Sequence, residues 1–201
     1  MPRPYRLGQR QAIAEQTRAR IVEAAREMLV AADTYTSFSI EAVAREADVA
    51  RMTVYHQFGS KLGLLEAVCD SLAATGGMEH LAAVFRSPQL DEALALFVAA
   101  FSRFWSADRP VIRRLNAFAV FDPDFTAVMQ ARNERRRHAL MALLEHHCAQ
   151  MTPARREEIA AVLFTLTSFE CFDILAGASH TPEEVTPQIL RLAQLTMSDL
   201  G

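Results

Sequence analysis

The sequence predicts an all-α fold, as three observations indicate: its composition, the spacing of its apolar residues and the placement of its prolines. The chain of 201 residues holds only seven glycines and is 51% hydrophobic, enough to bury a sizeable core in one or two domains. Alanine, leucine, glutamate and arginine recur throughout, and these side chains lose little rotamer freedom in a helix. Apolar residues repeat at intervals of three to four. Predicted helices start at or just after Pro88, Pro110, Pro123, Pro153 and Pro182, where proline is tolerated.

The first 12 residues are expected to form a flexible basic arm. They are polar, contain two prolines and carry Arg3, Arg6 and Arg10 without any acidic residue. From Ile13 the apolar spacing becomes that of an amphipathic helix, which is expected to end near Ala32, before a cluster of turn-forming residues.

A helix-turn-helix is predicted next. Two short helices are expected over residues 40–47 and 50–58, separated by a tight break at Asp48. Ser39 is placed to cap the first helix, and Gly59 can end the second in the left-handed conformation.

The N-terminal three-helix domain is predicted to cover residues 13–76. A longer helix, capped by Ser60, starts at Lys61 and is interrupted by the two glycines at 76 and 77, where we place the domain boundary. Residues 77–201 are expected to form a second helical domain. Its helices are predicted over about 78–86, 89–107, 110–121, 124–150, 154–178 and 182–199.

The predicted helix 50–58 separates its side chains into two faces. Val54 and Phe58, one turn apart, are expected to anchor it to the preceding helix. The other side carries large, mostly polar side chains at i,i+4 spacing and on one flank, namely Arg51, Met52, Thr53, Tyr55 and His56.

A short helix with such a face fits the major groove of double-stranded DNA. Arginine can donate to guanine, threonine or methionine can contact a thymine methyl, and histidine can reach an acceptor. Ser39, Tyr55 and Lys61 are placed as donors to backbone phosphates, which position a protein without reading sequence. The competing interpretation is a helical hairpin that never meets DNA, since any short amphipathic helix exposes polar groups.

The nine residues Thr53-Val-Tyr-His-Gln-Phe-Gly-Ser-Lys61, followed by Leu64-Leu65, carry a resemblance to a known family. With the residues before them, from Thr17 to Val68, they are similar to the tetracycline-repressor-like (TetR) transcription regulators. The resemblance implies that Tyr55 and Lys61 contact phosphates and that Ser39 caps a helix near the DNA backbone. It also implies that four side chains face the bases, those of Arg51, Met52, Thr53 and His56.

The sequence departs from the family pattern at three places. Asp48 stands where the family usually has a glycine, but aspartate tolerates the left-handed conformation better than most residues. Ala50 replaces a small hydroxyl residue, a loss of about 1 kcal/mol of helix capping. A family glycine ahead of the second helix is replaced within Asp33-Thr34-Tyr35. None of these changes removes the polar face.

The resemblance implies that residues 77–201 bind a small-molecule effector and dimerise. Ten of the 12 phenylalanines lie between Phe85 and Phe172, and ligand sites are mostly apolar with few polar groups. The candidate ligand-binding residues are Phe97, Phe101, Phe104, Trp105, Arg114, Asn116, Phe118, Phe121 and Phe164. The alternative for each aromatic residue is that it occupies an ordinary core position. The alternative for each polar residue is that it faces solvent or a second subunit.

A homodimer is predicted through the last two helices. Residues 159–176 are apolar nearly all round, so they require cover on both sides. We expect residues 154–178 and 182–199 to form a four-helix interface with their counterparts about a two-fold axis.

Other chemistry is not indicated. Adjacent helical residues point in different directions, so Glu145-His146-His147-Cys148 is not expected to bind a metal. The run Arg135-Arg136-Arg137 is interpreted as a solvated helix surface. Motifs of zinc proteases, serine hydrolases and nucleotide-binding loops do not occur, so we expect no enzyme and no cofactor.

Charge, cysteine content and apolar run length indicate the expected partner and the cellular compartment. The net charge is −3, but residues 1–61 carry +2 and residues 62–201 carry −5, so the predicted DNA-binding half is the basic one. Three widely spaced cysteines suit reduced thiols in the cytoplasm. The longest apolar run has nine residues, too few to span a membrane.

The predicted function is a ligand-responsive transcriptional regulator, by family habit a repressor. It would bind a pseudo-palindromic double-stranded DNA operator as a homodimer, with recognition helices about 34–36 Å apart. A small, largely apolar effector would release it. The alternative is a helical small-molecule-binding protein or enzyme that contains the helix-turn-helix incidentally.

Overall fold

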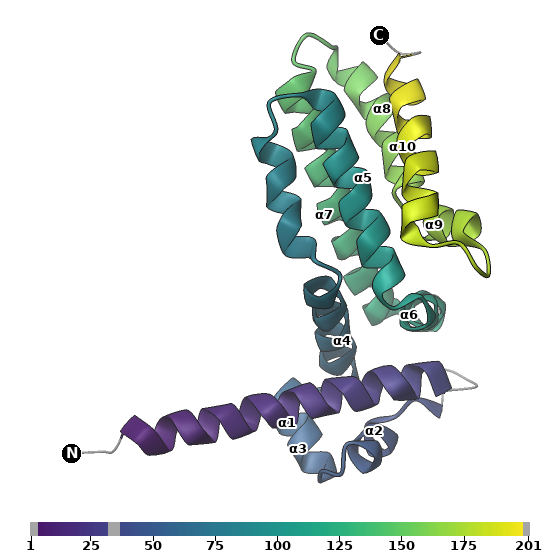
Figure 1. Ribbon diagram of the computed structural model, residues 1–201. Coiled ribbons are helices and arrows are strands. Elements are labelled where there is room, and N and C mark those ends of the chain that lie inside the picture. Colours follow the sequence, from purple (N-terminus) through teal and green to yellow (C-terminus); the bar gives the residue numbers. More distant parts are fainter. Residues whose placement is uncertain (1–3, 32–36, 199–201) are drawn as a thin grey trace. The chain divides into compact units, whose positions relative to one another are not determined.

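The computed structural model describes residues 4–31 and 37–198, with side chains from Gln9 onward (Figure 1). All regular structure within these residues is helical, which confirms the predicted all-α class. The elements are α1 (Pro4–Ala31), α2 (Ile40–Glu46), α3 (Arg51–Phe58), α4 (Lys61–Thr75), the 3-10 helix η2 (Met78–Arg86), α5 (Leu90–Ala107), α6 (Arg109–Phe121), α7 (Pro123–His147), α8 (Pro153–Leu166), α9 (Phe169–Ala176) and α10 (Pro182–Ser198).

The chain divides into two compact units. The first unit comprises the residues up to Ser71 together with Pro110–Thr126, and the second comprises Leu72–Arg109 and the residues from Ala127. The predicted N-terminal segment 13–76 falls almost wholly in the first unit. The structure adds nearly all of α6 to that unit, although sequence analysis assigned these residues to the C-terminal segment.

The first helix is longer than the sequence predicts. Helical structure begins at Pro4, so residues 4–12 of the predicted arm belong to α1, while residues 1–3 lie outside the described part of the chain. Proline lacks only a donor that the first turn leaves unused, and the residues that follow are mostly good helix formers. The buried face starts later than expected, because Ile13 is 62% exposed and Ile21 is the first buried residue of α1 among those whose side chains are described.

The helix-turn-helix forms as its sequence predicts. Ser39 caps α2, with its hydroxyl oxygen accepting a hydrogen bond from the Ala42 amide at 3.2 Å. In the turn, Asp48 has a φ of 49°, the left-handed conformation expected of it. Gly59 ends α3 with a φ of 74°, and the Ser60 hydroxyl accepts from the Gly63 amide at 3.0 Å to cap α4.

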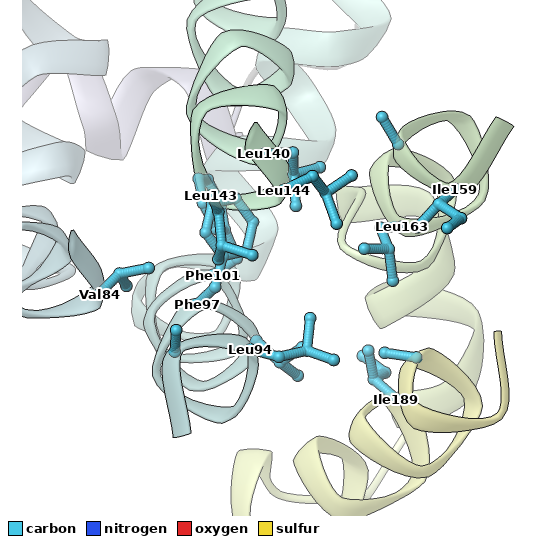
Figure 2. Packing of buried hydrophobic residues seen from close by; sticks show 14 of the residues in the cluster. Val84, Leu94, Phe97, Phe101, Leu140, Leu143, Leu144, Ile159, Leu163 and Ile189 are labelled. Atoms are coloured by element: carbon cyan, nitrogen blue, oxygen red, sulfur yellow. The ribbon is translucent and has the colours of Figure 1, made fainter. Parts of the chain in front are cut away.

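The second unit is a helical bundle with one apolar core. Helix α10 packs on both α5 and α8, and η2 packs on α5. Figure 2 shows leucine, isoleucine and phenylalanine side chains of α5, α7, α8 and α10 meeting in this core. Its largest fully buried members include Phe97, Leu94, Leu140 and Phe172.

The predicted continuous helix 154–178 is wrong, because the structure breaks it into α8 and α9. The two helices meet at a bend of 45° across Thr167 and Ser168. The Ser168 hydroxyl accepts from the Cys171 amide at 3.1 Å, and the Thr167 hydroxyl donates to the Leu163 carbonyl at 2.8 Å. Such side-chain bonds compete with the helical ladder, so the hydroxyl residues that interrupt this apolar segment start a new helix.

Two further boundaries differ from the prediction. Residues 78–86 form a 3-10 helix, which begins after Gly77 in the left-handed conformation. Helix α7 ends at His147, three residues before the expected end. Within the described residues, no single helix is long and apolar enough to cross a membrane, and the bent pair α8 and α9 meets that test only by length and composition.

Candidate nucleic-acid interface and aromatic cluster

Helix α3 has the two faces that its sequence predicts. Val54 is completely buried in the core of the first unit. Arg51, Met52 and His56 are exposed, while Thr53 and Tyr55 are half-buried. The helix is thus anchored through one face and presents its polar side chains on the other.

Arg51 is held in place by two neighbours. Its Nε lies 2.8 Å from a carboxylate oxygen of Glu41 in α2, and its Nη2 donates to the Tyr55 hydroxyl at 3.2 Å. The Tyr55 hydrogen bond and the Glu41 carboxylate raise the pKa of Arg51 above its ordinary value. The predicted i,i+4 pair of Arg51 and Tyr55 is therefore present, and Glu41 joins it from the preceding helix.

The C-terminal end of α3 is held by a residue that sequence reasoning missed. Arg18 of α1 donates from Nη1 to the Gln57 carbonyl at 2.9 Å, and its guanidinium lies 4.4 Å from the centre of the Phe58 ring. A cation near the last carbonyls of a helix also interacts favourably with the helix dipole. The two partners are 39 residues apart, so no local spacing indicates the contact.

Two of the predicted phosphate donors are partly engaged within the protein. Ser39 is half-buried, and its oxygen is used in the cap of α2. Lys61 is half-buried too, with Nζ 5.4 Å from the centre of the Phe38 ring. Burial lowers the pKa of Lys61, while the negative charge of Asp122 acts in the opposite direction.

The predicted ligand-binding residues do not gather in one unit. Phe97, Phe101, Phe104, Trp105 and Phe164 belong to the second unit, whereas Arg114, Asn116, Phe118 and Phe121 lie on α6 in the first.

The predicted residues on α6 have different surroundings. Phe118 is buried, with its ring centre 5.8 Å from that of Phe38, so it packs in the core of the first unit. Phe121 is 70% exposed. Arg114 and Asn116 are half-buried. The spacing of aromatic residues in the sequence could not show which of these residues belong to which unit. The tertiary fold places α6 in the first unit, and no local pattern indicates this.

The rings of the second unit form a connected group. Trp105 of α5 lies 4.5 Å from Phe104, 6.1 Å from Phe101 and 5.6 Å from Phe169 of α9, measured between ring centres. Its indole nitrogen donates to the Thr167 carbonyl at 2.9 Å, at the break between α8 and α9. We call these four rings and that of Phe164, which contacts the same arginine, Arg136, as Phe101 and Trp105, the aromatic cluster: Phe101, Phe104, Trp105, Phe164 and Phe169.

Arg136 of α7 lies against this cluster, which corrects the interpretation of the arginine run as a solvated surface. The residue is only 5% exposed, and its guanidinium carbon lies 4.0 Å from the centre of the Phe164 ring. Its neighbours differ: Arg135 is exposed and Arg137 pairs with Glu157 at 2.7 Å. The run crosses from the surface into the core because consecutive helical residues point in different directions.

A second arginine of the same unit is bonded to α9. Arg109 lies 2.8 Å from the Asp173 carboxylate and donates to the Gly177 carbonyl at 2.7 Å. Asp173 is thus engaged in an internal ion pair. In the described ranges, no three His, Cys, Asp or Glu residues are grouped so that they could hold a metal ion.

A helix-turn-helix that presents a polar face of its second helix, in an all-helical chain, is typical of DNA-binding transcriptional regulators. Residues 21–68 match the family model of bacterial regulatory proteins, tetR family. This segment, which carries the resemblance seen in the sequence, is thus similar to the tetR family. A comparison with curated protein sequences gave no match.

Solved structures of transcriptional regulators share the fold. The TetR family regulator PfmR from Thermus thermophilus is 18% identical, with 86% of this chain and 96% of that chain covered and a TM-score of 0.68. A TetR-like regulator from Rhodococcus sp. RHA1 is 21% identical, with 98% of both chains covered and a TM-score of 0.66. A third, from Saccharomonospora viridis in complex with choline, is 17% identical, with 90% and 96% covered and a TM-score of 0.65.

Proposed function

We propose that this protein is a homodimeric repressor that binds a pseudo-palindromic DNA operator and is released by a small effector. The observation that supports it most is the face of α3, where Arg51, Met52 and His56 are exposed while Val54 is fully buried. The buried anchor fixes the orientation of the helix, so the same three side chains are always presented. In a major groove, the arginine would donate to guanine and the methionine would contact a thymine methyl.

The phosphate contacts are assigned to Ser39, Tyr55 and Lys61. Tyr55 lies in the second half of α3 and Lys61 is the first residue of α4, and Tyr55 already orients Arg51. Phosphate donors fix the register of a helix in the groove, so this pair would align the base-reading side chains. Ser39 caps the first turn of α2, and it would contribute to a phosphate contact at the N-terminus of that helix.

The test is DNA binding by the double variant Tyr55→Phe with Lys61→Ala. The probe is a duplex selected from random sequences by the wild-type protein, and affinity is measured at several salt concentrations. We expect weaker binding and a less steep dependence on salt, because fewer counterions are released on binding. Arg135→Ala is the matched control, since it removes one exposed positive charge from the second unit. Unchanged affinity and salt slope in the double variant would contradict the assigned phosphate contacts.

The dimer interface is proposed on α8, α9 and α10. Exposed apolar side chains remain on the segments 154–178 and 182–199, namely Val162, Ile174, Leu192 and Leu195. A second copy of the chain is the occupant that the two-fold symmetry of a pseudo-palindromic operator requires. We expect Leu192→Glu with Leu195→Glu to give monomers in analytical ultracentrifugation. Leu96→Glu on α5 is the control, since Leu96 is also exposed but lies outside these segments. A dimer that persists in the double variant argues against this interface.

Effector binding is proposed in the second unit, at the aromatic cluster. Three of its rings, Phe104, Trp105 and Phe164, are half-buried, so the cluster reaches the surface. The similar protein from Saccharomonospora viridis binds a cation, choline. Here Arg136 already places a positive charge beside the rings, which disfavours a cationic effector. Helix α4 begins in the first unit and ends in the second, so it is the proposed route by which the effector changes DNA affinity.

The proposal places the protein in the cytoplasm, with the DNA that it regulates. Its cysteines Cys69, Cys148 and Cys171 are thiols and not disulfides, which suits a reducing compartment.

A further inference from the structure

Arg136 is a buried cation whose hydrogen bonds are all to neutral groups. Its Nη1 donates to the Phe164 carbonyl at 2.9 Å and to the Thr167 hydroxyl at 3.3 Å, and its Nη2 donates to the Asn133 side chain at 3.4 Å. The first two acceptors lie at the end of α8, where the helix dipole also favours a cation. These contacts explain why the guanidinium points toward the break between α8 and α9.

The same contacts leave the charge without an anionic partner. No described carboxylate forms an ion pair with Arg136; Glu170 acts on it only through its field and is itself exposed. The Nε atom is buried and has no hydrogen-bond partner. Taking a charge out of water costs several kcal/mol unless an opposite charge and further hydrogen bonds compensate for it. The rings of Phe164, Phe101 and Trp105, at 4.0, 5.8 and 6.0 Å, supply only part of that compensation.

We propose that Arg136 anchors the effector through an anionic group, so that the effector is an apolar molecule with a carboxylate end. The carboxylate would accept hydrogen bonds from the guanidinium, including the unpaired Nε, and the apolar body would pack on the half-buried rings of the aromatic cluster. This inference rests on the proposed function, because it names the chemical class of the effector. It narrows that class from largely apolar molecules to amphiphilic acids.

The contrasting explanation is that Arg136 is an internal structural cation that only ties α7 to the end of α8. In that case its role ends with the hydrogen bonds to Phe164 and Thr167. Ligand affinity would then not depend on the charge of the ligand. The two explanations differ in one measurable property, which is the dependence of ligand affinity on the charge of the ligand head group.

The experiment compares three probes with the same apolar tail: octanoate, octanol and octyltrimethylammonium. Binding to the full-length protein is measured by titration calorimetry and checked by thermal shift. We expect octanoate to bind about 10- to 100-fold more tightly than octanol, the size of a hydrogen-bonded charge pair, and octyltrimethylammonium to bind most weakly. Higher salt should weaken octanoate binding more than octanol binding.

Variants then assign the preference to Arg136. Arg136→Met should bind octanoate no better than octanol, and Arg136→Lys should keep a reduced preference, because an ammonium lacks the planar fork. Arg135→Met, one residue away and exposed, is the control and should bind like the wild type. Where Arg136→Met fails to fold, the reduced preference of Arg136→Lys assigns the octanoate preference to Arg136.

Equal binding of octanoate and octanol, no binding of octanoate, or an unchanged preference in Arg136→Met would each overturn the inference. The wild-type protein is also tested for binding to its selected DNA with and without octanoate. Arg136-dependent octanoate binding that leaves DNA affinity unchanged would support the anionic site and contradict the release of DNA by this effector. DNA release without a head-group preference would support release by an effector and contradict the anionic site at Arg136.

Discussion

Arg18 in α1 and Gln57 in α3 are joined by a hydrogen bond of 2.9 Å from the guanidinium to the main-chain carbonyl. Together with the Phe58 ring beneath the same guanidinium, this bond ties the last turn of the proposed recognition helix to the first helix. The helix has one buried anchor in Val54, and Arg18 supplies a second at its C-terminal end.

We therefore expect Arg18→Ala to lower the free energy of unfolding by about 1 kcal/mol, the usual worth of one hydrogen bond and an exposed cation–π contact. The variant should also bind selected DNA more weakly, because the end of α3 is less well fixed. Urea unfolding and DNA titration measure both effects. Arg20→Ala removes the same charge from an exposed position of α1 and should leave stability almost unchanged. Equal stability of the two variants would contradict the second anchor.

The turn between α2 and α3 provides a test of backbone strain. Asp48 has a φ of 49°, where a side chain is disfavoured and glycine is not. Asp48→Gly is expected to stabilise the protein by about 0.5 kcal/mol, and Asp48→Val to destabilise it by about 1–2 kcal/mol. Asp48→Asn removes the charge but keeps tolerance of this conformation, so its melting temperature should match that of the wild type. A stabilising valine would argue against the observed turn.

Substitutions at the N-caps of α2 and α3 are expected to change the free energy of unfolding in opposite directions. Ser39 accepts from the Ala42 amide, so Ser39→Ala should cost about 1 kcal/mol. Ala50 has the extended backbone of a cap, with φ −66° and ψ 142°, but no side chain to accept a bond. Ala50→Ser should therefore raise the free energy of unfolding by about 0.5–1 kcal/mol. Denaturant unfolding of both variants tests the pair, and a destabilising Ala50→Ser is the contrary result.

Lys61 gives a pH dependence of known sign. Burial lowers the pKa of its ammonium below the ordinary value of 10.5. Between the folded pKa and 10.5 the unfolded chain binds more protons than the folded chain, so the free energy of unfolding rises with pH. The cost of burying the charge is complete below the folded pKa and is removed as pH rises through it. Lys61→Met lacks this slope, and because Lys61 is the only lysine, the difference between the two proteins isolates it. In urea unfolding from neutral pH to 10.5, the free energy of unfolding of the wild type should rise relative to that of Lys61→Met. If the difference between the two free energies falls or stays constant, the burial of Lys61 is contradicted.

Two ion pairs of nearly equal length test the effect of burial. The Arg109–Asp173 pair, at 2.8 Å, has side chains only 18% and 21% exposed, and Arg109 also bonds the Gly177 carbonyl after α9. The Arg155–Glu158 pair, at 2.7 Å, has a glutamate side chain that is 65% exposed. Asp173→Ala is expected to cost about 1–3 kcal/mol and Glu158→Ala less than about 0.5 kcal/mol. Thermal unfolding of the two variants measures the contrast, and equal losses would contradict it.

Sequence alone determined the features that depend on neighbours along the chain. The two short helices, the caps at Ser39 and Ser60, the left-handed Asp48 and the separation of Val54 from the exposed face of α3 all follow from local spacing and backbone preference. Each involves residues no more than a few positions apart. For the same reason, the family of the N-terminal segment could be recognised from one short motif.

The tertiary structure decided what depends on residues far apart in the chain. It placed α6 in the first unit, where Phe118 packs on Phe38. It brought Arg18 to the end of α3 and buried Arg136 within a run that looked solvated. Helical periodicity shows that a residue faces inward, but which helix covers it, and with what charge, is set by packing between segments that no local pattern relates.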